Sequence, residues 1–273
     1  MSDSPGWMKG NADGHALEID TSVAHPARVW DYWLEGKDNF PPDREVGEQI
    51  LAALPEFAVI ARADREFLGR AVRYLAGEVG IRQFLDIGTG IPTANNTHEV
   101  AQSVAPESRI VYVDNDPIVL AHARALLTSS QEGATDFLDA DMHEPQAILD
   151  AAAETLDFSK PVAVTILATL EFVTTTEEAK SVIDRLLSPM PEGSFLVISH
   201  PVHSESMDEA GRLWNESGAT PVTIRSLDEV ASLFDGLEML EPGLVPLPQW
   251  RPDENTRYTD RDFSYVGAVG RKP

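Results

Sequence analysis

The chain has 273 residues, no cysteine and a formal net charge of −24 at pH 7. These values exclude a disulfide framework, a thiolate metal site and a cysteine nucleophile, and we predict no other metal site. An acidic surface repels phosphate backbones, so we expect a small-molecule or cationic substrate and no nucleic acid. No secretory signal and no apolar run of ~18 residues is visible, which predicts a cytoplasmic protein that does not bind or span a membrane.

The first 80 residues are predicted to form an arm and a helical cap. Residues 1–22 are rich in Gly, Asp and Ser without periodicity, which is typical of a flexible arm. Apolar residues at helical spacing predict three helices within 23–80, and Asp43 should cap the second of them. The block could cover the carboxyl ends of the strands as a lid, or it could only enlarge the core.

The stretch 81–87 predicts a buried parallel strand that ends in Asp86-x-Gly88-x-Gly90. Two glycines let the chain turn sharply and let a ligand approach the backbone, although such pairs also occur in purely structural turns. A helix over 98–104 and a second strand over 109–113 would complete a βαβ unit. The unit predicts a nucleotide site at the end of the first strand.

Asp114 follows the second strand, where a carboxylate can accept hydrogen bonds from both hydroxyls of a ribose. A role as helix cap alone is less favoured, because Asp116 before Pro117 already supplies a cap. A dinucleotide site favours a third glycine where Thr93 stands, so a pyrophosphate is disfavoured. Asp86 beside the loop suits the sulfonium and amino group of S-adenosylmethionine.

Acidic and histidine side chains follow each later strand. Asp141 lies just past a short third strand, where it could accept from the adenine amine while Met142 packs on the ring. His143 is a candidate base, although a loop histidine is more often a surface residue. Glu171 follows a strand over 161–168 and could contact substrate, act as a base or interact with a helix terminus. His200 ends a fifth strand and should lie at the pocket rim.

The remainder of the chain predicts a helical insertion over 201–217, a last helix that Ser226 caps, and two closing strands over 237–245 and 263–269. A strand pair after five βα units indicates a hairpin ending. The order of the acidic sites and this hairpin resemble the class I S-adenosylmethionine-dependent methyltransferase fold. That resemblance implies an α/β, Rossmann-like, seven-stranded and mostly parallel sheet with an antiparallel last strand, here over 81–273.

Several blocks are more specifically similar to the actinobacterial S-adenosyl methyltransferase family, formerly a domain of unknown function. They are ARVWDYWLEGKDNF at 27–40, FLDIGTGIPT at 84–93, NTHE at 96–99, VYVDNDP at 111–117 and VGRKP at 269–273. The sequence departs from the usual residues of this family in two places. Glu35-Gly36-Lys37 replaces Gly-Gly-Lys, and Leu170-Glu171-Phe172 replaces Leu-His-Phe. The second departure indicates a different substrate or a weakened activity.

The resemblance implies roles for individual residues. Asp86, Gly88 and Gly90 would hold the methionine end of the cofactor, Asp114 the ribose and Asp141 the adenine. The segment from Tyr32 to Asn39 would cover the cofactor. The full predicted cofactor set is Asp86, Gly88, Thr89, Gly90, Thr93, Asp114, Asn115, Asp141, Met142, Tyr32, Lys37, Asn39 and Arg65, with Lys37 or Arg65 neutralising the cofactor carboxylate.

The predicted function is methyl transfer from S-adenosylmethionine to an unidentified, small-molecule acceptor, with S-adenosylhomocysteine as product. A general base is needed only for a protonated hydroxyl or amine, and Glu171, His143 and His200 are the candidates. Two alternatives stay open. One is a regulatory or partner-binding protein that binds the cofactor without transfer, and the other is an NAD-dependent oxidoreductase, disfavoured because no Tyr-x-x-x-Lys motif is visible. The sequence also leaves a homodimer open.

Overall fold

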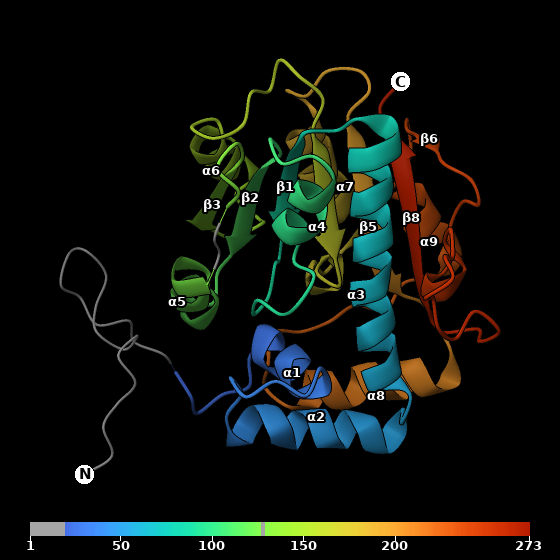
Figure 1. The fold of residues 1–273 in the computed structure, drawn as a ribbon. Helices are drawn as coiled ribbons and strands as arrows, with labels where there is room; N and C mark the ends of the chain where they lie inside the picture. Colours follow the sequence, from blue (N-terminus) through green and yellow to red (C-terminus); the bar gives the residue numbers. More distant parts are fainter. Residues whose placement is uncertain (1–19, 127–128) are drawn as a thin grey trace, which may run out of the picture.

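The computed structural model describes residues 20–126 and 129–273 (Figure 1). Nearly all of the predicted arm therefore lies outside the described residues. No helix in the described ranges is both long and apolar enough to span a membrane.

A single sheet lies at the centre of the fold, with strand order β3-β2-β1-β4-β5-β8-β6 and β7 paired to β8. All pairs from β3 to β5 are parallel, and β8 is antiparallel to its neighbours. Strand order reverses between β1 and β4, which creates a crevice outside their carboxyl ends. The strands are β1 (Gln83–Ile87), β2 (Arg109–Asp114), β3 (Ala134–Asp139), β4 (Ala163–Leu167), β5 (Phe195–Pro201), β6 (Glu238–Met239), β7 (Val245–Pro246) and β8 (Tyr265–Arg271).

The edge of the sheet beyond β8 differs from the prediction. The expected strand over 237–245 is wrong, because β6 and β7 are separate short strands that share this edge position. Pro242 and Gly243 lie between them, and proline cannot donate a hydrogen bond to the sheet. The seven sheet positions and the antiparallel last strand are confirmed, although residues 20–126 and 129–273 contain eight strands.

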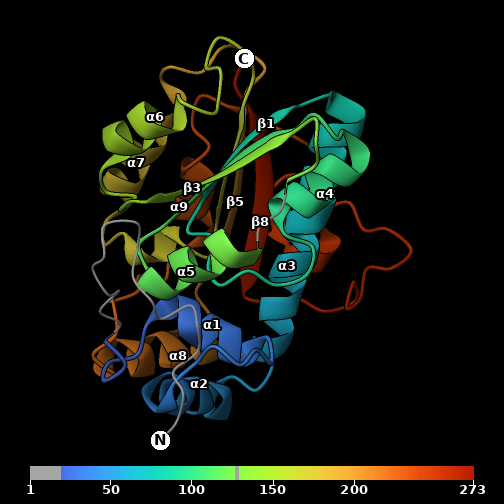
Figure 2. The ribbon, with the colours of Figure 1, turned by 60° about the vertical axis from the view of Figure 1, so that its left-hand side comes forward.

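Helices cover both faces of the sheet, as Figure 2 shows. One face packs on α3 and α4, and the other packs on α6, α7 and α9. Neighbouring residues of β1 supply opposite faces, because Phe84 belongs to the first core and Leu85 to the second. The helices on the sheet are α3 (Phe57–Tyr74), α4 (Thr97–Val104), α5 (Pro117–Leu126), α6 (Pro145–Ala152), α7 (Thr176–Leu187) and α9 (Leu227–Ser232).

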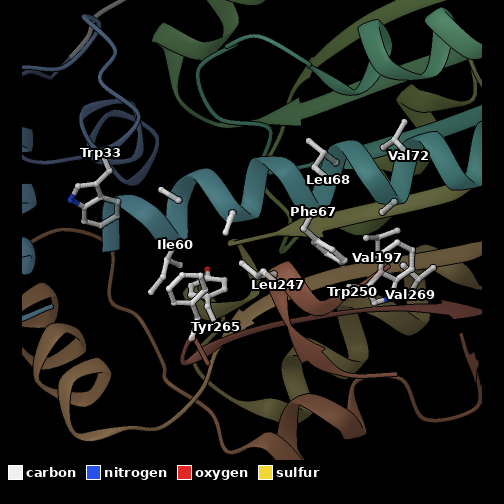
Figure 3. Packing of buried hydrophobic residues seen from close by; sticks show 14 of the residues in the cluster. Trp33, Ile60, Phe67, Leu68, Val72, Val197, Leu247, Trp250, Tyr265 and Val269 are labelled. Atoms are coloured by element: carbon white, nitrogen blue, oxygen red, sulfur yellow. The ribbon is translucent and has the colours of Figure 1, made fainter. Parts of the chain in front are cut away.

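The structure divides the predicted helical cap into two parts. Helices α1 (Pro26–Trp33), α2 (Pro41–Ala53) and α8 (Glu205–Glu216) lie at one end of the sheet (Figure 1). Helix α3 instead runs along the sheet face and continues into a π-helix, η2 (Leu75–Val79). Side chains of α3 pack against those of β8 (Figure 3). The packing is close, because a Cβ added at Gly267 of β8 would lie 2.8 Å from the Phe67 ring of α3.

Asp43 is not the N-cap residue of α2 that the sequence predicted, but lies at the third helical position. Helix α2 begins two residues earlier, at Pro41, because proline is well suited to the first helical position. The buried Asp43 carboxylate instead accepts the N–H groups of Phe40, at 2.7 Å, and His25, at 2.9 Å. It therefore ties the start of α2 to the start of α1. The other predicted caps, Ser226 for α9 and Asp116 for α5, each accept a backbone N–H as expected.

Candidate functional site

A cavity of about 320 Å³ lies where α1 faces the ends of β1, β2, β3 and β4. The position is the crevice that the reversal of strand order creates. Most of the predicted site residues meet at its wall: Arg65, Asp86, Gly88, Thr89, Gly90, Thr93, Asp114, Asn115, Asp141, Met142 and His143. These residues come from helix α3 and from three separate strand ends, so the sheet topology brings them together.

The glycine loop requires glycine at two positions. Gly88 and Gly90 have φ angles of +71° and +67°, which L side chains adopt only with strain. A Cβ at Gly88 would also lie 2.1 Å from Oγ1 of Thr169, so a side chain does not fit there. Apart from Gly90 and its two chain neighbours, no described residue has a heavy atom within 4 Å of a Cβ built at Gly90. The loop thus presents bare backbone beside the cavity.

The Asp114 carboxylate is held by the glycine loop and by its own strand end. Its Oδ2 accepts the N–H of Gly90 at 2.8 Å, and its Oδ1 accepts the N–H of Asp116 at 2.9 Å. Burial raises the pKa of Asp114 above its usual range, while these two hydrogen bonds act in the opposite direction. Each carboxylate oxygen has a further lone pair, so Asp114 can still accept two ligand hydroxyls.

Asp86 is more fully engaged inside the protein than the sequence suggested. Its Oδ2 accepts the hydroxyl of Thr97 at 2.6 Å, and its Oδ1 accepts the hydroxyl of Thr165 at 2.7 Å. Burial raises the pKa of this carboxyl. Asp86 therefore links β1 to α4 and β4 at the floor of the cavity. Its contact with a ligand amino group stays a prediction.

Arg65 is the cation that faces this cavity from α3. Its Nη2 donates to the carbonyl oxygen of Asn95 and to Oδ1 of Asn96, both at 3.3 Å. Its Nε is buried and has no hydrogen-bond partner in the described part of the chain. A buried N–H without a partner is costly, and a ligand carboxylate would satisfy it. Lys37, the other predicted cation, is exposed and does not line the cavity.

Tyr32 and Asn39 are also not among the residues that line the cavity, whereas Leu34 of the same predicted covering segment is. For Tyr32, helical periodicity explains the difference, because the residues of α1 that line the cavity are Pro26, Ala27, Trp30 and Asp31. Asn39 acts indirectly. Its Nδ2 donates to Oδ2 of Asp31 at 2.7 Å and so fixes a carboxylate that does reach the cavity.

Helix α1 is tied to the end of β2 by charged side chains. Nδ1 of His25 lies 2.8 Å from Oδ2 of Asp116, and Nε of Arg28 lies 3.5 Å from the same oxygen. Arg28 also lies 3.8 Å from Asp43 of α2. Since Asp116 donates its N–H to Asp114, the same network connects the cap to the predicted ribose contact.

Asp141 and His143 lie together at the mouth of the cavity. Oδ1 of Asp141 is 2.6 Å from Nδ1 of His143 and accepts its backbone N–H at 2.9 Å. Partial burial opposes ionisation of Asp141, but the contacts with His143 outweigh it and lower the pKa. The side chains are 48% and 41% exposed, so this pair is partly hydrated. Met142 lies beside it on the cavity wall.

Glu171 lines a second, narrower cavity of about 40 Å³, and Trp30 and Phe172 line both cavities. It lies in a 3₁₀ turn, η3 (Leu170–Phe172), directly after β4. Its Oε1 accepts the hydroxyl of Tyr265 at 2.8 Å, and its Oε2 is buried without a partner. Burial raises the pKa of Glu171 to about 7.

His200 does not lie at the pocket rim, so that prediction is wrong. Strand β5 extends past it to Pro201, and Arg225 covers its ring. Nε2 accepts from Nη1 of Arg225 at 2.6 Å, and Nδ1 donates to the carbonyl oxygen of Pro201 at 2.7 Å. Burial lowers the pKa of His200 to about 3, so its ring is neutral.

Sequence reasoning missed Asp64, which precedes Arg65 on α3. It lines the main cavity, is 5% exposed and has an Oδ1 without a hydrogen-bond partner. Burial raises its pKa to about 6. One signal was present in the sequence, since Asp64 lies one helical turn after the buried Ile60 and one turn before the buried Leu68. A carboxyl on a buried helix face often marks a functional site.

The raised pKa of Glu171 predicts a pH-dependent stability difference. An acid whose folded pKa lies above its ordinary value of 4.5 stabilises the fold below that value, and this contribution is lost as pH rises through about 7. Glu171→Gln removes the titration and keeps an acceptor for Tyr265. Relative to the wild type, the variant should gain roughly 3 kcal/mol in unfolding free energy between pH 4.5 and 8. Denaturant unfolding measures this gain.

The exposed Glu192 provides the control for that experiment, because Glu192→Gln removes the same charge at the surface. The unfolding free energy of Glu192→Gln should change with pH in the same way as that of the wild type. A Glu171→Gln curve parallel to the wild-type curve would contradict the buried, raised-pKa assignment.

The fold is the Rossmann-like fold of class I methyltransferases. The sequence profile of the S-adenosyl methyltransferase family matches residues 12–273, and the chain belongs to that family. Its methyl donor is S-adenosylmethionine. A search of curated proteins found no significant match.

Solved structures agree with this assignment. A DUF574 family protein from Streptomyces avermitilis is 46% identical, with a TM-score of 0.90 over 94% of this chain and 100% of its own. A candidate methyltransferase from Thermobifida fusca is 36% identical, with a TM-score of 0.85 over 93% and 96%. At 12% identity, the magnesium protoporphyrin IX methyltransferase of Synechocystis, crystallised with S-adenosylhomocysteine, shares the fold with a TM-score of 0.52 over 90% and 93%.

Proposed function

We propose that this chain methylates a small-molecule acceptor, a reaction of class EC 2.1.1, with S-adenosylmethionine bound in the main cavity. The observation that carries the proposal is that one cavity is lined both by Asp114, which is paired with the glycine loop, and by Arg65. Asp114 offers carboxylate acceptors for ribose hydroxyls. Arg65 offers a guanidinium N–H that has no partner among the described residues and could donate to a carboxylate.

The residues present fit the parts of this cofactor. Asp114 would accept from the ribose, Met142 would pack on the adenine, and Asp141 would accept from the adenine amine. Arg65 would hold the methionine carboxylate, and Gly88 and Gly90 would allow the close approach of the ligand to backbone. Asp86 and Asp31 add negative charge that favours a sulfonium and an ammonium over a phosphate.

The catalytic contribution of the chain is mainly positional. When bound, S-adenosylmethionine supplies an electrophilic methyl group. Helix α1, fixed by Arg28 and His25, would cover the cavity and exclude water as a competing nucleophile. The fixed strand ends would align the acceptor with the methyl group, which contributes on the order of several kcal/mol. The cytoplasmic location and the homodimer stay predictions from the sequence.

Transfer of an isotopically labelled methyl group tests the proposed acceptor class. The chain would be incubated with labelled S-adenosylmethionine and a bacterial extract divided into low-mass and macromolecular fractions. We expect label in low-mass products, and no label above background with Asp114→Asn. Label confined to protein or nucleic acid would contradict a small-molecule acceptor. Cofactor binding without any transfer would favour the regulatory alternative.

A further inference from the structure

Two buried carboxyl groups line the two cavities that share Trp30 and Phe172. Asp64 lines the main cavity and Glu171 lines the narrower one, and each is 5% exposed. Each has one buried oxygen, Oδ1 of Asp64 and Oε2 of Glu171, without a hydrogen-bond partner among residues 20–126 and 129–273. The Tyr265 hydroxyl donates to Glu171, and burial, together with the charges of Glu171 and Asp64, raises the Tyr265 pKa. These two oxygens of Asp64 and Glu171 are therefore hydrogen-bond acceptors that a ligand donor could satisfy.

Neither carboxyl group forms an ion pair within the described ranges. The positive charge of Arg225 lowers the pKa of Glu171 but does not overcome the effect of burial. The Arg225 guanidinium donates instead to the carbonyl oxygens of Leu170 and Val173 and to His200. The positive charge of Arg65 likewise lowers the pKa of Asp64 less than burial raises it. Nη2 of Arg65 donates hydrogen bonds to the loop before α4. A buried, unpaired carboxylate is costly, so a cationic ligand would be favoured there.

Aromatic rings enclose the narrower cavity. Trp33 and Trp214 lie 6.1 Å apart between ring centroids, and Phe57 and Tyr265 lie 6.4 Å apart. Trp30 lies between the two cavities, 6.4 Å from Tyr265. Aromatic faces attract a cation as well as an apolar body. The volume of about 40 Å³ matches about three water molecules, which limits the occupant to a short group.

We propose that the narrower cavity binds the methyl acceptor and that this acceptor is a small apolar amine, with its nitrogen between Asp64 and Glu171. The proposal rests on the proposed function, because it places the acceptor beside the cofactor cavity. An ammonium can donate to both free oxygens and neutralise negative charge. An alcohol donates only once, and a carboxylate or phosphate would be repelled by both acids.

The transfer step balances with Glu171 as the proton acceptor. The ammonium first gives one proton to the Glu171 carboxylate, and burial among aromatic rings favours this by lowering the ammonium pKa. The nitrogen lone pair then forms the N–CH₃ bond while the methyl–sulfur bond breaks and its electron pair stays on sulfur. The products are a methylammonium and a neutral thioether. Glu171 afterwards releases its proton to solvent.

Binding of two isosteric probes tests this inference. Isobutylamine and isobutanol would be titrated into the wild-type chain saturated with S-adenosylhomocysteine, with ligand-observed NMR as the readout. We expect the amine to bind at least about tenfold more tightly than the alcohol. Glu171→Gln should weaken amine binding by about tenfold or more and change alcohol binding less than about threefold. Glu192→Gln, a surface control, should change neither.

Equal or tighter binding of the alcohol would overturn the inference, as would amine binding that is insensitive to Glu171→Gln. Asp64→Asn is a second variant that should also weaken amine binding. If neither variant folds, the wild-type comparison of the two probes decides the matter alone. Binding of S-adenosylhomocysteine is measured in the same samples. Its failure in the wild type would refute the proposed function, whereas its success without amine preference would refute only this inference.

Discussion

Asp114→Asn should lower the affinity for S-adenosylhomocysteine by about 100-fold or more. Hydrogen bonds to a charged acceptor contribute about 1.5–3 kcal/mol each, so the loss of two ribose contacts corresponds to at least this factor. In the wild type, the N–H groups of Gly90 and Asp116 both donate to the Asp114 carboxylate. In the variant, the asparagine NH₂ group would face one of these two donors and could not accept from it. Calorimetric titration measures the affinity, and thermal unfolding without ligand separates it from a stability effect.

Asp139 supplies a matched control for Asp114. It is the residue paired with Asp114 across β2 and β3, and it is exposed at the end of its strand. Asp139→Asn removes the same charge from the neighbouring strand end, so its affinity should stay within about threefold of the wild type. A similar loss in both variants would indicate a general electrostatic effect and contradict a specific ribose contact.

Arg65→Ala should weaken binding of S-adenosylhomocysteine by about 10- to 100-fold and leave binding of 5′-methylthioadenosine nearly unchanged. The second ligand keeps the adenosine and the sulfur but lacks the amino acid group. A charge-assisted contact worth about 1.5–3 kcal/mol should therefore disappear for one ligand only. The ratio of the two dissociation constants, measured by calorimetry on the same variant, isolates the carboxylate contact from changes in the fold.

Arg62 lies on the same helix with a 37% exposed side chain that pairs with Glu35 at the surface. Arg62→Ala should leave both ligands within about threefold of their wild-type affinity. If Arg65→Ala weakens both ligands equally, the role of Arg65 is to hold the loop at Asn95 and Asn96 and not to bind the carboxylate.

The central part of the fold could be predicted because its signals are local. Each parallel strand is a short apolar run, and Asp86 and Asp114 mark the strand ends that face the cavity. The broken edge strand could not be predicted in the same way. Its two pieces are only two residues long, and pairing with β8 determines where they form.

The covering segment shows why sequence blocks alone do not assign contacts. Tyr32, Lys37 and Asn39 lie beside the residues that do reach the cavity, but the face of α1 that points inward depends on its packing against α2 and α3. Asp64 and Glu171 lie far apart in the sequence, and only the tertiary fold reveals that they line two cavities with Trp30 and Phe172 in common, each with a buried oxygen that has no partner among the described residues. Long-range pairing of this kind leaves no local pattern.

The most direct test of the central claim is a calorimetric titration of the wild-type chain with S-adenosylhomocysteine and, in parallel, with NAD. We expect one molecule of S-adenosylhomocysteine per chain, displaced by S-adenosylmethionine, and no measurable binding of NAD, because Thr93 stands where a pyrophosphate site favours a third glycine. Binding of NAD alone, or of neither ligand, would contradict the assignment of this cavity.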